Sequence, residues 1–144
     1  TDERMMVRLL AFALNAPATN DRGYLEFGKD IWDPDEPALW RKDLTGLLVD
    51  WIEVGQPDER RLQRVTARAE RVGVYCFSSG SGQWWSGLVN KLTRTRNLEV
   101  WQVPAAASEA LGALAERSMD LQVTVQEGVI WVGNGEQTVE IVLE

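Results

Sequence analysis

One carboxylate stands out because of its surroundings: Glu53 lies near the end of the apolar run from Leu47 to Val54. A carboxylate in such a run is costly to remove from water unless it is ion-paired, bound to a metal or open to a cleft. The acidic turn that precedes the run can deliver a second carboxylate, Asp35 or Glu36. Residue type alone leaves two interpretations for Glu53: a structural ion pair or rim position, and a residue of a chemical site.

The segment around Glu53 has the pattern of a strand, a helix and a second strand. Leu47 to Gly55 is predicted as a strand, and Gly55-Gln56-Pro57 ends it. An Arg-rich helix follows from about Asp58 to Arg71, and a second apolar run extends from Val72 to Phe77. Strand, helix and strand of these lengths predict a crossover unit, so the two strands should be parallel neighbours in one sheet.

Five segments carry a resemblance to a known family: TDERMMVRLLAFAL, DEPALWRKDLTG, WIEVGQPDERRL, NKLTRTRNLEV and LQVTVQEGVIWVGNGEQTVEI. The acidic turn beside a proline, followed by an acid on the next strand, resembles the core of the PD-(D/E)xK nuclease superfamily. The whole chain looks closer still to the YaeQ family, a small bacterial family that carries this nuclease-like fold in variant form. Proteins of that family have an additional N-terminal stretch with strands, so we expect such a segment to be missing here.

The resemblance implies a Mg²⁺-dependent phosphodiesterase that acts on nucleic acid. Asp35, Glu36 and Glu53 would hold Mg²⁺ through oxygen and let it polarise the scissile phosphate. Gln56 would orient water or phosphate, and Glu3 on the first helix would support the site. Glu3 has a second interpretation, because an acid in the first turn of a helix complements the helix dipole.

Two positions depart from the superfamily pattern. Ala38 stands where an aspartate commonly follows the proline, and Gly55 stands where the catalytic lysine belongs. Fast hydrolysis needs a replacement for that charge, and Arg61, Arg64 or Lys42 could supply it. The alternative is a nuclease scaffold that has lost its chemistry and serves as a binding or regulatory module, since function resides in the site and not in the fold.

Two groups of cations are the candidates for contact with nucleic acid. They are Arg61, Arg64, Arg68 and Arg71 on the predicted helix after Glu53, and Lys91, Arg94 and Arg96 further along. In one interpretation such a band is a solvated face laced with acids, and in the other it tracks phosphates. The net charge of −7 requires a concentrated basic surface to overcome repulsion. We predict that Arg61 or Arg64 borders the pocket that holds Glu53.

The remaining elements complete an α/β prediction. Residues 24–37 show no clean period and are predicted as a mobile or lid-like loop, and Trp84 and Trp85 are predicted as core more than as base-stacking residues. The other predicted elements are a helix over Asp2–Asn15, a short strand near Leu39–Arg41, a helix over Gln83–Thr93, a strand over Asn97–Val103, a helix from Pro104 to about Ser118, and an antiparallel meander over Leu121–Leu143 with turns at Glu127-Gly128 and Asn134-Gly135. The predicted fold is a mixed sheet with a restriction-endonuclease-like parallel core, flanked by helices and extended by the meander.

Composition sets the class of protein. A chain of 144 residues is predicted as one domain over 1–144 with a sizeable core. The single cysteine, Cys76, lies in an apolar run and is expected to behave as a small hydrophobe. No histidine is available as a base or ligand. No apolar run approaches the ~20 residues of a membrane span and no secretory signal is visible, which predicts a cytoplasmic protein. The sequence identifies no protein partner.

Overall fold

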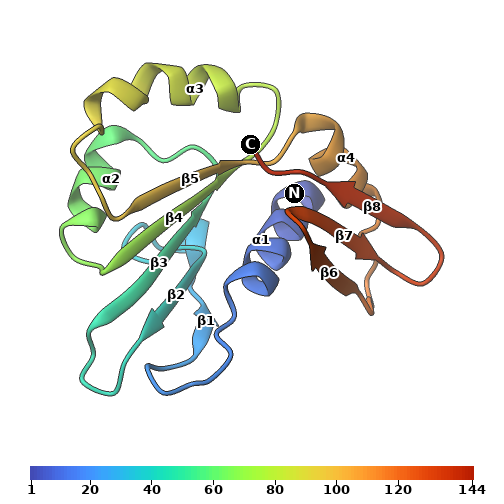
Figure 1. Ribbon diagram of the computed structural model, residues 1–144, viewed down its shortest axis with the longest axis horizontal. Helices are drawn as coiled ribbons and strands as arrows, with labels where there is room; N and C mark the ends of the chain where they lie inside the picture. The colour runs from blue at the N-terminus through green and yellow to red at the C-terminus, as the bar shows by residue number, and fades with distance from the viewer.

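The computed structural model describes residues 1–144, the whole sequence. It contains a five-stranded sheet with the order β1-β2-β3-β4-β5 and a three-stranded sheet with the order β6-β7-β8 (Figure 1). The strands are β1 (Leu25–Phe27), β2 (Leu39–Lys42), β3 (Leu48–Val54), β4 (Arg71–Cys76), β5 (Leu98–Gln102), β6 (Gln122–Gln126), β7 (Val129–Gly133) and β8 (Thr138–Ile141). The helices are α1 (Asp2–Asn15), α2 (Glu59–Thr66), α3 (Ser81–Leu88) and α4 (Ala105–Ala113), with single 3-10 turns η1 (Asp30–Trp32) and η2 (Val89–Lys91). None of the helices is long and apolar enough to cross a membrane.

The larger sheet is mixed, and its parallel half forms around the crossover that the sequence predicts. β1 pairs antiparallel with β2, and β2 pairs antiparallel with β3. β3, β4 and β5 run parallel, and Glu53 on β3 lies opposite Val74 on β4. The two predicted strands are therefore adjacent and parallel, and the predicted α/β fold class is confirmed.

The two faces of β3 bury different side chains, as alternation along a strand requires. Ile52 and Val54 belong to the main core, which also contains apolar residues of α1, α4 and the small sheet. Trp51 packs instead with Val65 of α2 and Val72 of β4. Figure 1 shows α2 and α3 on one side of the larger sheet, and α1 between that sheet and the small one. Glu53 follows Trp51 by two positions and is directed toward α2.

The small sheet is the predicted meander. Its first turn, Glu127-Gly128, has positive φ at both residues, 52° and 81°, as a two-residue turn that matches strand twist requires. Gly128 adopts its positive φ at no steric cost because it has no Cβ. The second turn contains Asn134-Gly135, and Gly135 also has a positive φ, 93°. The sheet contributes Ile130, Val132 and Ile141 to the main core. Turn chemistry and alternation were therefore sufficient to predict this part of the chain.

Asp50, the second acid of the apolar run, joins three strands. It is 2% exposed, and its carboxylate accepts hydrogen bonds from Arg41 Nε of β2 and Arg71 Nε of β4, both at 2.8 Å. Arg71 also donates to Asn15 Oδ1 at 2.8 Å, and Asn15 Nδ2 donates to the Tyr75 hydroxyl at 3.0 Å. Burial raises the pKa of Tyr75, which keeps this acceptor neutral near pH 7. The network assigns Arg71 to the interior of the sheet and corrects its predicted place in a basic helical band.

Several elements have other bounds than the periodicity predicts. α2 ends at Thr66 and not at Arg71, because Arg71 already pairs with Asp50 in the register of β3 and β4. α3 is followed by η2 in place of one continuous helix, and α4 ends at Ala113, before the predicted end at Ser118. The segment 24–37 contains β1 and η1. A three-residue strand is too short to show a period, and pairing with β2 forms it.

The second, smaller layer of core lies under α3. Trp84 and Trp85 are partly buried and pack against the cluster of Leu62, Val74 and Leu92. The Trp84 indole N–H donates to the Pro57 carbonyl at 3.0 Å. Both tryptophans therefore serve in packing, as predicted.

Cys76 is fully buried in β4. Burial raises the pKa of its thiol, and the thiol lies 3.4 Å from the Trp101 carbonyl oxygen, to which it donates. A neutral, buried thiol is a poor nucleophile. The predicted role of Cys76 as a small hydrophobe is confirmed.

Candidate functional site

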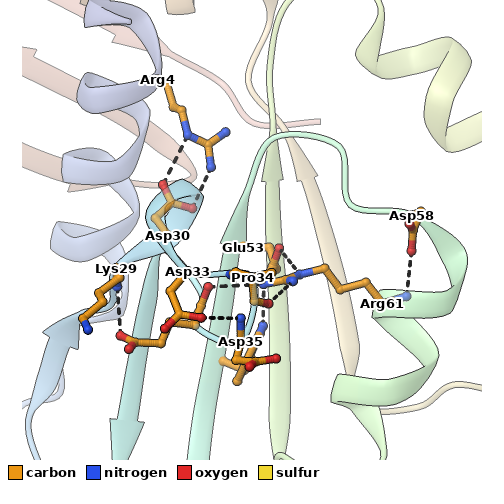
Figure 2. A network of polar contacts seen from close by, with 11 residues as sticks. Arg4, Lys29, Asp30, Asp33, Pro34, Asp35, Glu53, Asp58 and Arg61 are labelled. Carbon is orange, nitrogen blue, oxygen red and sulfur yellow. Dashed lines mark hydrogen bonds and ion pairs between the residues drawn. The ribbon is translucent and has the colours of Figure 1, made fainter.

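Several separate parts of the chain line a cleft of about 290 Å³ at the carboxyl end of β3. The lining residues are Arg4, Asp30, Ile31, Pro34, Glu53 and Arg61. Two ion pairs lie in it, and we call it the ion-pair cleft. Figure 2 shows how α1, the loop at residues 28–37, β3 and α2 bring these side chains together. The carboxyl ends of parallel strands are where open α/β sheets bind their ligands, so this cleft is the candidate site.

Glu53 is the acid of the first ion pair. It is 8% exposed, and Arg61 Nε lies 3.0 Å from each of its carboxylate oxygens, with Arg61 Nη2 at 2.9 Å from Oε1. The Trp51 indole N–H donates to the same Oε1 at 2.7 Å. These N–H groups offset the desolvation of the carboxylate. The structure contains the ion pair that the sequence left open for Glu53, and Glu53 also lines the cleft.

Arg61 is held by the start of α2 and in turn holds the loop at residues 28–37. Its backbone N–H donates to the carboxylate of Asp58, the N-cap of α2, at 2.7 Å. Its guanidinium donates to two loop carbonyls, those of Pro34 and Glu36, the second at 3.2 Å. Arg61 therefore uses all of its guanidinium nitrogens, lines the cleft beside Glu53 as predicted, and ties the loop to the sheet.

Arg4 is the cleft residue that sequence reasoning missed. It lies in the first turn of α1, and its Nε and Nη2 donate to the two carboxylate oxygens of Asp30 at 3.2 Å and 2.7 Å. Its third nitrogen, Nη1, lies 2.9 Å from the place that a Cβ on Gly55 would occupy. A cation from a distant helix thus stands over the position at which the superfamily pattern has its lysine. Neither Lys42 nor Arg64 lies in the cleft.

The other departure from the superfamily pattern, Ala38 in place of an aspartate, also has a physical reason. Ala38 is fully buried in the main core, and its carbonyl accepts a hydrogen bond from Arg8 Nε at 3.1 Å. A carboxylate at this position would have to enter an apolar core without a partner, which is costly. The aspartate of the superfamily pattern therefore has no equivalent in the packing of this chain.

The other predicted site residues lie apart from the cleft lining. The Glu36 carboxylate accepts the Lys29 backbone N–H at 2.9 Å, while Asp35 is exposed. Gln56 is exposed, with its amide nitrogen 3.6 Å from where a Cβ on Gly80 would stand. Glu3 accepts a hydrogen bond from the Ser108 hydroxyl of α4, so it links two helices of the core. Asp35, Glu36, Gln56 and Glu3 do not line the cleft, although the Glu36 backbone carbonyl shares Arg61 with Glu53.

Mg²⁺ binds several oxygen ligands in octahedral geometry, and the cleft does not offer them. Both oxygens of Glu53 accept N–H groups of Arg61, and both oxygens of Asp30 accept N–H groups of Arg4. Nowhere in the chain do three or more Asp, Glu, His or Cys side chains gather as metal ligands. The residues of the cleft, as they are paired here, do not fit a magnesium ion.

Gly55 should be intolerant of any side chain. Its φ of +110° is a conformation that residues with a Cβ rarely adopt. We expect Gly55→Ala to lower the free energy of unfolding by about 1–3 kcal/mol, as measured by urea denaturation. An added Cβ would also lie 2.9 Å from Arg4 Nη1. The double variant Arg4→Ala/Gly55→Ala separates this contact from the backbone strain, because it removes the contact and keeps the strain. An equal stability of Gly55→Ala and the wild-type chain would contradict this account.

The fold and the cleft together define a mixed α/β protein with a charged candidate site at the carboxyl edge of a parallel crossover. The model of the YaeQ protein family matches residues 1–143, and the chain belongs to this family. It is 37% identical to a YaeQ protein of Escherichia coli strain K12 over 143 residues, which cover 98% of this chain and 76% of that protein. The predicted resemblance to the YaeQ family is confirmed.

Two solved structures of YaeQ proteins are similar to this chain over nearly its whole length. The crystal structure from Xanthomonas axonopodis pv. citri has 42% sequence identity and a TM-score of 0.91, and the match covers 99% of this chain and 78% of that one. The crystal structure from Pseudomonas syringae has 34% identity and a TM-score of 0.89, with 100% and 77% covered. These matches establish the fold and the family, and none of the names states an activity.

Proposed function

We propose that this chain is a nucleic-acid-binding module on a nuclease-like scaffold, and that it holds a phosphodiester group at the ion-pair cleft. The observation that carries the proposal is the pair of arginines, Arg4 and Arg61, which enter one cleft from two helices. Guanidinium forks pair bidentately with phosphate oxygens, as they do with carboxylates. The site is at the carboxyl edge of the parallel strands, where ligands of open α/β sheets bind.

In the free protein, acids of the cleft stand in for the phosphate. Asp30 accepts two hydrogen bonds from Arg4, and Glu53 accepts three from Arg61. A phosphodiester could take the place of Asp30 on Arg4, whose side chain is 24% exposed. The N–H of Arg4 at Nη1 faces Gly55 and has no carboxylate partner. Arg4 is thus the contact we expect a phosphate to make first.

The pairing of the Glu53 carboxylate with Arg61 is the reason to favour binding over hydrolysis. A metal-dependent phosphodiesterase needs carboxylate oxygens that are free to hold a cation, and those of Glu53 are engaged by Arg61. The Glu36 carboxylate accepts the Lys29 backbone N–H, and neither Asp35 nor Glu36 lines the cleft beside Glu53. The module that the sequence left as the alternative is therefore the function that the geometry supports best.

A Mg²⁺-dependent phosphodiesterase is the second candidate, and one observation favours it. Arg4 provides a cation beside Gly55, where the superfamily pattern has its lysine, so the charge that hydrolysis needs is not lost from the cleft. This candidate requires Arg61 to leave Glu53 and the loop at residues 28–37 to open. Asp35 and Glu36 lie on that loop.

The test measures binding and cleavage of short labelled DNA and RNA at low salt. Arg4→Gln should weaken binding by about tenfold, the equivalent of one charged hydrogen bond. Arg117→Gln is the matched control, because it removes the same charge from an exposed arginine outside the cleft. Absence of binding by the wild-type chain, or equal affinities of the two variants, would overturn the proposal.

The same samples with added Mg²⁺ or Mn²⁺ decide between the two candidates. The binding module predicts intact oligonucleotide in every sample. Cleavage that requires the metal and disappears in Glu53→Gln would replace the binding module with the phosphodiesterase. Circular dichroism of each variant checks that it is folded.

A further inference from the structure

Five exposed arginines of this acidic chain have no ion-pair partner although they lie on neighbouring segments. They are Arg60, Arg64, Arg68, Arg94 and Arg96. The ion pairs of the structure, from Arg4–Asp30 to Lys91–Glu59, use none of them. Together with Lys91 we call these residues the arginine surface. The chain has 22 acids and 15 cations, so carboxylates are in excess, yet none of them pairs with these five arginines.

The two segments that carry the arginine surface run side by side. One is α2 with the turn after it, and the other is residues 91–97, which connect η2 to β5 (Figure 1). Lys91 Nζ lies 3.5 Å from Glu59 Oε2 at the start of α2. Asn97 Nδ2 donates to the carbonyls of Thr66 and Ala69 at the other end, at 2.9 Å and 3.0 Å. The two segments are therefore in contact at both ends, and each exposes its cations to solvent.

Charge is strongly segregated toward this surface. Residues 59–71 and 91–97 hold eight of the fifteen Lys and Arg residues and only two of the 22 Asp and Glu residues. Both of these acids are paired, Glu59 with Lys91 and Glu70 with Arg22. Arg60 and Arg64 are one helical turn apart, a like-charge spacing that destabilises a helix. A surface of this kind costs stability unless a polyanion neutralises it.

α2 connects the arginine surface to the ion-pair cleft. Its buried side carries Leu62 and Val65, while Arg61 turns into the cleft and Arg60 and Arg64 face solvent. Eight helical residues span about 12 Å, a length over which each strand of a duplex places three or four phosphates, at about 3.4 Å of helix axis per phosphate. A polynucleotide with one phosphate at the cleft can therefore extend along α2 in the same binding event.

We infer that the arginine surface is a backbone track for a polynucleotide that leaves the ion-pair cleft along α2. The inference rests on the proposed function and adds the surface and the length of ligand it takes. Five of its six cations are arginines, whose planar forks fit phosphate oxygens better than the point charge of lysine. The two basic groups, which are separate in sequence, thus act together, without Arg61 and Arg71, whose guanidinium groups pair with Glu53 and Asp50.

The test compares a 5-nucleotide with a 25-nucleotide single strand. The variant is Arg60→Gln/Arg64→Gln/Arg94→Gln/Arg96→Gln, in which every substituted side chain is exposed, so the fold should persist. It should lose about 100-fold affinity for the longer strand, with a log–log salt slope smaller by about 3, as expected when four phosphate contacts are removed. Its affinity for the 5-nucleotide strand should stay within about twofold, because the cleft alone binds it. The indole N–H signal of Trp51, which donates to Glu53, reports occupation of the cleft.

A matched pair of double variants separates a track from general electrostatics. Arg64→Gln/Arg94→Gln should weaken binding of the 25-nucleotide strand. Lys42→Gln/Arg117→Gln, which changes the net charge equally at exposed sites outside the cleft and its loop, should not. Equal losses in the two double variants would overturn the inference. So would competition by polyglutamate or anionic vesicles as strong as that by the 25-nucleotide strand.

The outcomes also separate this inference from the proposed function. A wild-type chain that binds neither strand overturns both. A wild-type chain that binds the 5-nucleotide strand, with a quadruple variant that binds the longer strand normally, overturns the track and leaves the cleft proposal standing. Loss of binding in the quadruple variant alone, with Arg4→Gln as tight as wild type, overturns the cleft proposal and with it the inference that the track begins at the cleft.

Discussion

Replacing Asp50 with alanine is expected to lower the free energy of unfolding by about 3 kcal/mol. The carboxylate is 2% exposed and holds both Arg41 and Arg71. Its removal leaves Arg41 without an anion and leaves Arg71 with only the exposed Glu99 carboxylate, at 3.5 Å. Water offsets part of this cost, because 18% of the Arg41 side chain and 38% of the Arg71 side chain are exposed. Urea denaturation followed by circular dichroism measures the change.

A surface ion pair gives the control for this prediction. Arg22 and Glu70 are joined at 2.7 Å, but their side chains are 51% and 43% exposed. Glu70→Ala should therefore cost less than about 1 kcal/mol, the ordinary value for an exposed pair. If Asp50→Ala destabilises the chain no more than Glu70→Ala does, the three-strand network makes no special contribution to stability.

Replacing Arg61 with methionine is expected to cost about 2–4 kcal/mol, because the Glu53 carboxylate would stay buried with only the Trp51 N–H as a donor. Adding Glu53→Gln should restore a large part of the loss, since a neutral amide needs less compensation and still accepts from Trp51. The double-mutant cycle over the two positions gives the coupling energy directly. Arg64→Met, on the exposed side of the same helix, should change stability by less than about 0.5 kcal/mol.

Arg61→Met should also loosen the loop at residues 28–37. Arg61 donates to the carbonyls of Pro34 and Glu36, and its removal leaves that stretch of the loop without these contacts to α2. Faster amide hydrogen exchange in residues 28–37 of Arg61→Met, with unchanged exchange in β3 and β4, is the expected result. A coupling energy near zero, with unchanged exchange in the loop, would show that the ion pair neither stabilises β3 nor restrains the loop.

Much of the fold could be predicted from local patterns. The apolar runs around Glu53 and Cys76, separated by an amphipathic Arg-rich segment, predict a parallel crossover, and glycine turns between alternating runs predict the meander. Both patterns are local in sequence, and the physics behind them, periodic burial and turn stereochemistry, acts over a few residues. The bounds of α2 and the existence of β1 could not be predicted this way, because strand pairing with distant residues decides them.

The candidate site, like the fold, could be predicted only in part from local patterns. The sequence predicts that Glu53 needs compensation, that Arg61 or Arg64 of the next helix borders its pocket, and that the lysine of the nuclease pattern is absent. The pairing of Arg61 with Glu53, and the position of Arg4 over Gly55, follow from the packing of α1 and α2 against the sheet. Periodicity tells which side of an element a residue occupies. Which distant side chain meets it depends on how the helices lie across the sheet, and no local pattern carries that information.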